Sequence, residues 1–253
     1  MTQAREPNSE DEHPAQPYDP SYYEEQGVSA DRLALWYYAR VFGRLCPGSG
    51  RVLEFGCGTG HLLKRLSRTF EAYGYDLSAS ARAACRENAP EATVLEEWES
   101  IPGGSLDGIV TLHTLEHIAR PLAVVSALVD RLNTGGRLLV VVPNTGSPGR
   151  SWKGEDWFGF RDATHCSLLS RGEWATLLRR AGLEIDWIQG DGLWDAPYVR
   201  WLPTGVQKVL FGFPAGLQLL SPIPRPILPA DFGECLIIAA SKPGNPSGQP
   251  RNT

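Results

Sequence analysis

The sequence VLEFGCGTG at residues 52–60 is the stretch that decides the fold. An apolar run typical of a buried strand leads directly into glycines at every second position. Glycine lets a backbone turn sharply and approach a ligand closely, because no Cβ stands in the way. The next residues, HLLKRLSRTF at 61–70, carry apolar side chains at helical spacing. The stretch therefore predicts a strand, a glycine turn and a helix, which is how many α/β folds bind nucleotides.

Strand and helix patterns alternate on both sides of this turn. Helical spacing occurs in four more segments, at 31–45, 78–89, 121–136 and 170–182. Short apolar runs predict seven strands, at 51–55, 71–76, 92–96, 106–113, 137–143, 183–189 and 233–242. Strands that are apolar on both faces and alternate with helices predict a mostly parallel sheet covered by helices on both sides. Ligands of such sheets bind at the carboxyl ends of the strands, so the chemistry is expected there.

The composition is that of a globular protein with one core. The chain has 253 residues, of which 42% are hydrophobic and 21% are charged. Its formal net charge is −5, and residues 1–25 alone carry −6, so the rest of the chain is nearly neutral. An acidic chain is not built, as a whole, to wrap nucleic acid, and no nucleic-acid partner is expected.

The ends of the chain and the cysteines bear on domain organisation and location. Residues 1–17 are predicted to be a disordered acidic tail, 18–242 a single domain, and 243–253 a second disordered tail. The polar start MTQAREPNSEDEHPAQ does not have the apolar region of a secretory signal. Five scattered cysteines without a CxxC pair suggest neither a disulfide framework nor a zinc knuckle. A reduced, cytoplasmic protein is expected.

Two classes of cofactor fit a glycine turn of this kind. Asp76 ends the second predicted strand, where its carboxylate can accept hydrogen bonds from both ribose hydroxyls. A dinucleotide fingerprint would read G-x-G-x-x-G/A, but here the third glycine comes one residue early and His61 takes the last position. Glu54 would repel a pyrophosphate, whereas it suits a ligand with a positive ammonium group. An NAD(P)-dependent oxidoreductase is therefore the less favoured alternative.

Four motifs in order carry a family resemblance. They are EFGCGTG at 54–60, YDLS at 75–78, LDGIV at 106–110 with LEH at 115–117, and GGRLL at 135–139. In this order they resemble the class I S-adenosylmethionine-dependent methyltransferases, over roughly residues 30–190 and the final strand. The resemblance implies a Rossmann-like α/β fold with a mostly parallel seven-stranded sheet and helices on both faces. It also implies S-adenosylmethionine as the cofactor.

The resemblance assigns roles in cofactor binding to named residues. The residues expected to contact the methionine part are Glu54, Gly56, Cys57, Gly58 and Gly60. Asp76 would hold the ribose and Leu77 would pack against the adenine. His113, at the end of the fourth strand, would face the methionine or the sulfonium. Near the adenine amine the candidates are Glu96, Glu97 and Trp98, and the sequence does not choose between them.

The first cluster that could act in methyl transfer is HTLEH at 113–117. Methylation of a hydroxyl needs a base, whereas an amine mainly needs to be neutral. In a helical turn, His113, Glu116 and His117 would share one face. The cluster resembles the Glu-x-x-Glu-His stretch of ubiquinone-pathway O-methyltransferases, which is associated with a divalent metal. Because His113 replaces the first Glu, no metal is expected, and His117 is expected to be structural or a general base.

The second cluster is WFGFRDATH at 157–165, which follows the fifth strand. Its Asp-x-Thr-His segment resembles a stretch of bacterial methyltransferases, several of them associated with sugars or lipids. Asp162 is expected to orient His165, as acid–imidazole pairs do. The alternative is a turn of Asp162 and Thr164 capped by His165. The catalytic candidates are thus His165, His117 and Asp162.

The segment 196–230 is an unusual insert before the last strand. It contains seven prolines and three bases, Arg200, Lys208 and Arg225, but no acid. Its longest apolar stretch, 206–220, is too short for a transmembrane helix and contains Lys208 and Pro214. Three interpretations stay open: a cap over the acceptor pocket, an interfacial segment at lipid headgroups over 198–229, or a dimer contact. The first two favour an apolar or lipid-linked acceptor.

The sequence therefore predicts a methyltransferase that acts, in the first place on oxygen, on a small-molecule, sugar or lipid-linked acceptor. Methylation of carbon or nitrogen stays open. A protein that binds S-adenosylmethionine without turnover is the non-enzymatic alternative, because the family has no single obligatory catalytic residue. The oligomeric state is not predicted.

Overall fold

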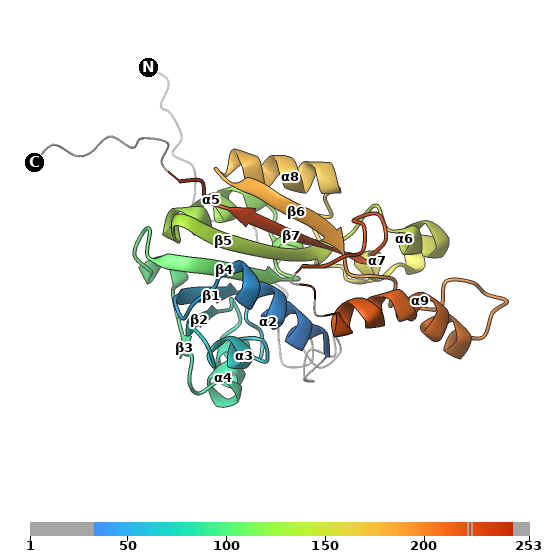
Figure 1. The fold of residues 1–253 in the computed structure, drawn as a ribbon, viewed down its shortest axis with the longest axis horizontal. Coiled ribbons are helices and arrows are strands. Elements are labelled where there is room, and N and C mark those ends of the chain that lie inside the picture. Colours follow the sequence, from blue (N-terminus) through green and yellow to red (C-terminus); the bar gives the residue numbers. More distant parts are fainter. Residues whose placement is uncertain (1–32, 222, 224, 245–253) are drawn as a thin grey trace, which may run out of the picture.

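The computed structural model describes residues 33–221, 223 and 225–244. Both predicted tails lie outside these residues, apart from 243 and 244. Among the described residues, seven strands form one sheet in the order β3-β2-β1-β4-β5-β7-β6 (Figure 1). The strands are β1 (Arg51–Phe55), β2 (Glu71–Tyr75), β3 (Thr93–Val94), β4 (Leu106–Leu112), β5 (Leu132–Pro143), β6 (Glu184–Gly190) and β7 (Cys235–Ser241). Only β7 pairs antiparallel to its neighbours, so the predicted mostly parallel sheet is confirmed.

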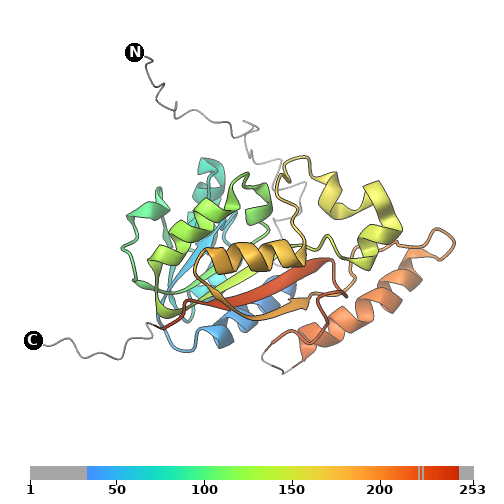
Figure 2. The same cartoon turned by 90° about the horizontal axis from the view of Figure 1, so that it is seen from above.

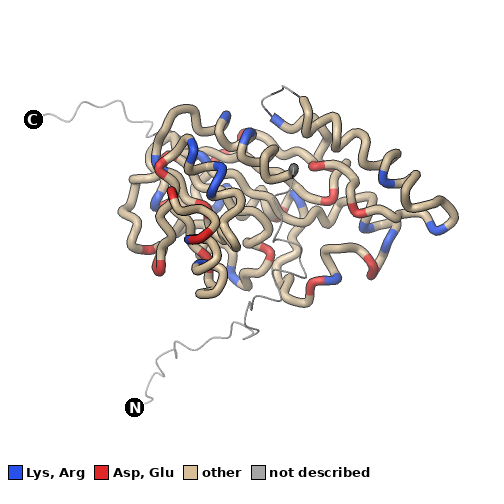
Figure 3. The backbone as a smooth tube through the Cα atoms, turned by 90° about the horizontal axis from the view of Figure 1, so that it is seen from below, with Lys and Arg blue, Asp and Glu red and all other residues tan. Residues whose placement is uncertain are grey.

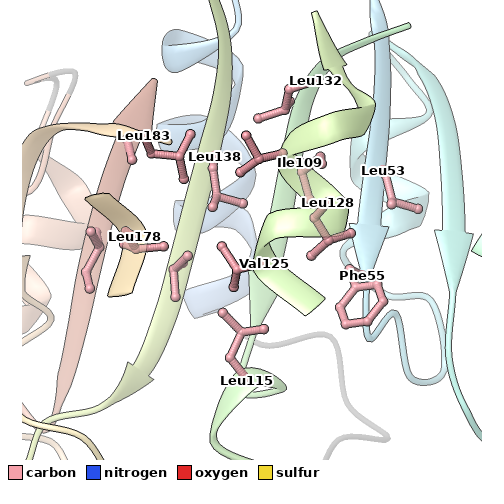
Figure 4. Packing of buried hydrophobic residues seen from close by; sticks show 14 of the residues in the cluster. Leu53, Phe55, Ile109, Leu115, Val125, Leu128, Leu132, Leu138, Leu178 and Leu183 are labelled. Atoms are coloured by element: carbon pink, nitrogen blue, oxygen red, sulfur yellow. The ribbon is translucent and has the colours of Figure 1, made fainter. Parts of the chain in front are cut away.

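Helices cover both faces of the sheet, as predicted. On one face pack α5 (Pro121–Arg131) and α8 (Arg171–Arg180), whose apolar residues join the core cluster seen in Figure 4. On the other face pack α2 (Leu33–Leu45), α3 (Leu63–Leu66) and α4 (Ala79–Asn88). The remaining helices are α6 (Pro148–Lys153), α7 (Phe158–Arg161) and α9 (Thr204–Leu220). Short 3-10 turns are η1 (Trp98–Ser100), η2 (Leu115–His117) and η3 (Gly154–Asp156).

Local signals in the sequence fix where two of these helices begin. Ser78 directly precedes α4, and its hydroxyl accepts a hydrogen bond from the Ala81 N–H at 3.3 Å. Ser170 and Glu173 form a capping box at the start of α8, in which each side chain bonds the other residue's backbone N–H. Such caps satisfy N–H groups that have no partner inside the helix.

Three predicted elements are shorter or begin elsewhere. The helix expected over 61–70 is only the single turn α3, and the strand expected over 92–96 is only β3. The helix expected over 121–136 ends at Arg131, because β5 already begins at Leu132. Leu132 is fully buried and pairs with Leu106 of β4, so sheet pairing overrides the helical pattern of this segment.

The carboxyl ends of β1, β2, β4, β5 and β6 meet at one edge of the sheet, and the antiparallel β7 begins there. The glycine turn after β1 and the residues after β2 and β4 therefore lie along this edge, where ligands of parallel sheets bind. The long segments that follow β5 and β6 also start at this edge. We call it the carboxyl edge.

A buried carboxylate at the carboxyl edge connects the segment after β5, the segment after β6 and the start of β7. Glu234, directly before β7, is fully buried. It accepts hydrogen bonds from Trp157 Nε1 at 2.7 Å, Ser147 Oγ at 3.1 Å and Tyr198 OH at 2.5 Å. Ser147 and Trp157 come from the segment after β5, and Tyr198 comes from the segment after β6. The sequence pattern gave no sign that Glu234 holds both segments against the sheet.

We expect Glu234→Leu to lower the free energy of unfolding by roughly 3–5 kcal/mol, since each buried donor left without an acceptor costs about 1–3 kcal/mol. Glu234→Gln keeps one acceptor oxygen and should lose less. Urea unfolding followed by tryptophan fluorescence measures both. A leucine variant as stable as the wild type would show that the cluster does not hold the two segments.

Candidate active site

The glycine turn after β1 is shaped by close contacts that only glycine allows. Gly56 and Gly60 have φ angles of +82° and +85°. A Cβ on Gly56 would lie 2.1 Å from Thr114 Oγ1, and one on Gly60 would lie 2.6 Å from Cys85 Sγ. The N–H groups of Gly56 and Cys57 both donate to the Tyr75 carbonyl, which ties the turn to the end of β2. The turn is thus a rigid backbone surface at the carboxyl edge.

Asp76, which follows β2 at the carboxyl edge, also holds this glycine turn in place. It is 8% exposed, and its Oδ2 accepts the Gly58 N–H at 2.8 Å. Its Oδ1 accepts the Ser78 N–H at 3.0 Å. The ribose role stays a prediction, and the structure adds a second task, which is to fix the turn.

Glu54 has the environment of a binding site for a positive group. Its side chain is buried, and Oε2 has no hydrogen-bond partner among the described residues. Burial raises the pKa of Glu54 well above its ordinary value. A cation beside this carboxylate would supply the missing partner and favour its charged form. The residues present therefore fit an ammonium group such as that of a methionine moiety.

The three candidates for the adenine amine lie in different surroundings. Glu96 pairs with Arg82 at 2.7 Å and with Arg86, so its charge is already balanced. Glu97 is exposed. The Trp98 ring is buried in the core and meets Phe55 edge-on at 5.5 Å. For Glu97 and Trp98 cofactor contact stays a prediction.

Leu77 and His113 lie along the carboxyl edge on either side of the glycine turn. Leu77 is 58% exposed, as a residue that packs against a ligand would be before the ligand binds. His113 has a φ of +49°, a conformation that is rare outside glycine and persists where surrounding structure enforces it. Its Nδ1 lies 3.2 Å from Glu116 Oε1 and its Nε2 lies 3.7 Å from Cys235 Sγ. Backbone strain of this kind clusters at functional sites.

The two catalytic clusters predicted separately form one site. The backbone N–H groups of Cys166 and Ser167 both donate to the Glu116 carbonyl at 2.9 Å. This pairing places the segment after α7 directly on the η2 turn. The rings of His117 and His165 lie with their centroids 4.7 Å apart. The condition of a helical turn is met only at Leu115–His117, which form a 3-10 turn, yet His113 still reaches Glu116.

The contacts of Asp162 differ from the expected pairing with His165. Asp162 Oδ1 accepts hydrogen bonds from the Thr164 N–H and hydroxyl, at 2.9 and 2.5 Å. The Thr164 oxygen lies 2.8 Å from His117 Nδ1, so Asp162 orients His117 through Thr164. The Gly159 carbonyl, 2.7 Å from Nδ1, orients His165 instead. Asp162 Oδ2 is 3.9 Å from His165 Nε2, which is an ion-pair distance and not a hydrogen bond.

These contacts define which ring nitrogens are basic. The Thr164 hydroxyl donates to Asp162, so it accepts from His117, and the Gly159 carbonyl can only accept from His165. Both imidazoles therefore carry their proton on Nδ1, which leaves Nε2 as the basic atom. Burial lowers the pKa of His117, which keeps this ring neutral near pH 7.

Glu116, His117 and His165 also have the chemistry of a metal-ligand set. Their ligand atoms lie within 4.8 Å of one another, and Glu116 Oε2 is buried without a hydrogen-bond partner among the described residues. One carboxylate and two imidazoles suit a divalent transition metal. The expectation of a metal-free site stays a prediction.

Asp191, directly after β6, is a residue of the carboxyl edge that the sequence did not point to. Its Oδ1 accepts the Cys235 N–H at 2.8 Å, and its Oδ2 accepts Trp194 Nε1 at 2.5 Å. Burial raises its pKa to about 6, and the nearby His113 opposes this rise. The pairing of β6 with β7 brings Asp191 next to Cys235. No local sequence motif predicts this pairing.

Comparisons with known proteins identify the family of the chain. Residues 29–187 match the family described as methyltransferase domain. A ubiquinone biosynthesis O-methyltransferase of Xanthomonas axonopodis pv. citri is 27% identical over 165 residues, which are 59% of this chain and 69% of that protein. One of Xanthomonas campestris pv. campestris is 28% identical over 113 residues, 41% of this chain and 47% of that protein, so the chain spans about half of this relative.

A solved structure shares the fold. The SAM dependent methyltransferase of Archaeoglobus fulgidus superposes with a TM-score of 0.62 at 19% identity, over 88% of this chain and 100% of that one. The family match covers more than half of the chain, so the chain belongs to the methyltransferase domain family. It is an S-adenosylmethionine-dependent methyltransferase, and this replaces the oxidoreductase alternative.

We expect Asp76→Ala to weaken binding of S-adenosylhomocysteine by about 1–3 kcal/mol, because a buried acceptor of hydrogen bonds is lost. Isothermal titration calorimetry measures the change. Glu71→Ala, at the opposite end of β2 and exposed, is the matched control and should bind as the wild type does. Unchanged affinity in Asp76→Ala would contradict the ribose assignment.

Asp191 should make folding stability depend on pH. Its folded pKa of about 6 lies above the unfolded value of about 3.9, so the unfolded chain loses this proton first as pH rises. The stability it contributes is present below about pH 4 and is lost as pH rises through about 6.

Asp191→Asn cannot ionise, so the difference in unfolding free energy between variant and wild type should change by up to about 3 kcal/mol between pH 4 and 7. Urea unfolding at several pH values measures it. Parallel curves for the two proteins would contradict a raised pKa.

Proposed function

We propose that this methyltransferase methylates a hydroxyl group, with the His117–His165 pair supplying the base. The observation that carries the proposal is the close, tilted placement of two imidazoles whose Nδ1 atoms are held by hydrogen bonds, at 2.8 and 2.7 Å. A hydroxyl is a poor nucleophile unless a base takes its proton. Two positioned imidazoles are suited to that task, whereas methylation of an amine would not need them.

The roles of the two rings differ. His165 is the base in our proposal, since Asp162 Oδ2 lies 3.9 Å from its Nε2, near enough to balance a positive charge after the proton is taken. His117 is the positioning residue, because Asp162 and Thr164 fix its ring and its ring lies against His165. Acid–imidazole arrangements of this kind orient the imidazole and stabilise its protonated form.

The cofactor supplies an already activated methyl group when bound. Glu54 would hold its ammonium, Asp76 its ribose, and the glycine turn its methionine part. Leu77, Glu97 and Trp98 would lie toward its adenine, and His113 toward the sulfonium. The protein's main contribution is to align the acceptor oxygen with this methyl group, and alignment of this kind accounts for much of the rate.

The acceptor class is proposed on two grounds. Both Xanthomonas relatives are O-methyltransferases of ubiquinone biosynthesis, and this likeness supports oxygen as the acceptor atom here. Helix α9 lies beside the carboxyl edge and exposes apolar side chains, which supports a small-molecule or lipid-linked acceptor. We infer a cytoplasmic location from the five free cysteines.

We expect His165→Gln to lower the rate of methyl transfer by about 10²–10⁴-fold, which is the range for loss of a general base. The affinity for S-adenosylhomocysteine should not change. Transfer of labelled methyl groups from S-adenosylmethionine into an extract of a deletion strain measures the rate. The organic and aqueous phases are counted separately.

His61→Gln, a histidine outside the cluster, is the matched control and should retain activity. Full activity of His165→Gln would remove it as the base. Cofactor binding with no transfer into either phase by the wild type would favour the non-enzymatic alternative.

A further inference from the structure

Helix α9 (Thr204–Leu220) buries two glutamines and leaves a stripe of apolar side chains exposed. Gln207, Ala215 and Gln218 are buried against the rest of the protein. The apolar residues on the opposite side are at least half exposed: Val206, Val209, Leu210, Phe213, Leu217 and Leu220. We call these six residues the outer face of α9. Their spacing of three or four residues places them along one stripe of the helix.

The buried glutamines fix which side of the helix faces out. Gln207 Oε1 accepts the N–H groups of Tyr198 and Val199, and its Nε2 donates to the carbonyls of Val199 and Leu202. Gln218 Nε2 donates to the Gly190 carbonyl at 3.0 Å. Rotating α9 to bury its apolar stripe would break these bonds and leave the amides without partners, at a cost.

The surroundings of the outer face are basic and aromatic. Trp201, just before α9, is 82% exposed. Arg200, Lys208 and Arg225 are exposed, and the segment 196–230 contains no acid. Figure 3 shows blue positions, without red ones, along this segment at the end of the molecule. Exposed indoles and basic side chains beside an apolar stripe are the pattern of helices that lie at lipid headgroups.

We propose that the outer face of α9 docks onto an anionic lipid bilayer. The apolar stripe would enter the boundary between headgroups and acyl chains, and Arg200, Lys208 and Arg225 would bind lipid phosphates. Among the helices that the structure describes, none is long and apolar enough to cross a membrane, so the contact is one of the surface.

A second copy of the chain is the competing occupant of this stripe. In a two-fold dimer the same patch meets itself, so three bases from each copy would enter one interface. The segment 196–230 offers no acid to pair with them. Like charges brought together without a partner destabilise an interface, whereas lipid phosphates neutralise them.

Docking in this orientation brings the carboxyl edge close to the lipid. Gln218 bonds Gly190 at the end of β6, and Arg40 Nη2 of α2 donates to the Leu219 carbonyl at 2.9 Å. Figures 1 and 2 both show α9 at the end of the molecule beside this edge. The proposal does not depend on which acceptor is methylated, because it concerns the outer surface of α9 alone.

The test is flotation of the full-length protein with vesicles of phosphatidylcholine and phosphatidylglycerol, and with vesicles of phosphatidylcholine alone. The wild type should float with the first and less with the second. Val209→Ser, Leu210→Ser and Phe213→Ser combined should reduce the bound fraction about tenfold or more, since apolar burial drives the insertion. Lys208→Glu combined with Arg225→Glu should abolish the preference for phosphatidylglycerol.

Arg179→Glu combined with Arg180→Glu, exposed on α8, is the matched control and should float as the wild type does. Binding of S-adenosylhomocysteine by each variant reports correct folding without using catalysis. Wild type that does not float, or a serine variant that floats unchanged, would overturn the proposal. A wild-type dimer that the serine variant loses, without vesicle binding by either, would assign the stripe to a second copy instead.

Discussion

The carboxylate of Glu234 is the constraint on which the arrangement around the site depends. It is fully buried and accepts hydrogen bonds from Ser147, Trp157 and Tyr198, on segments far apart in the sequence. A buried carboxylate is costly unless its oxygens are satisfied, and buried donors are costly unless they find an acceptor. Each group therefore requires the others, and the segments after β5 and β6 are held to the start of β7. The acceptor side of the carboxyl edge is built on this attachment.

The cluster around His117 and His165 shows how two weak motifs can form one well-defined arrangement. Taken alone, HTLEH at 113–117 and the Asp-x-Thr-His segment at 162–165 each allow a structural interpretation. Two backbone bonds to the Glu116 carbonyl bring them together, and Asp162 reaches His117 through Thr164. The sequence had predicted that Asp162 pairs directly with His165. In the structure Asp162 orients His117 through Thr164, and the Gly159 carbonyl orients His165. A hydroxyl group can donate one hydrogen bond and accept another, so Thr164 can connect Asp162 to the His117 ring. The spacing of these residues in the sequence does not reveal this connection.

The structure of helix α9 shows which of its residues are buried and which are exposed, and the composition of 196–230 did not reveal this. On its inner side, Gln207 and Gln218 satisfy backbone groups of neighbouring loops, next to the buried Ala215. Its outer side is apolar although nothing among the described residues covers it. A sequence with apolar residues on one side of a helix ordinarily indicates that this side is buried. Here the identity of the buried side is decided by hydrogen bonds, and the membrane proposal rests on that inversion.

The sequence by itself determined the sheet, the glycine turn and the family, because these depend on short-range patterns. Buried strands are apolar, the turn needs glycine at Gly56 and Gly60, and Asp76 follows its strand directly. Only the tertiary structure decided where β5 begins, which groups orient His117 and His165, and that Glu234 and Asp191 belong to the edge. Those outcomes depend on strand pairing and on partners up to 87 residues apart, such as Ser147 and Glu234. Long-range hydrogen bonds leave no periodic trace in the sequence, so they can be found only once the chain is folded.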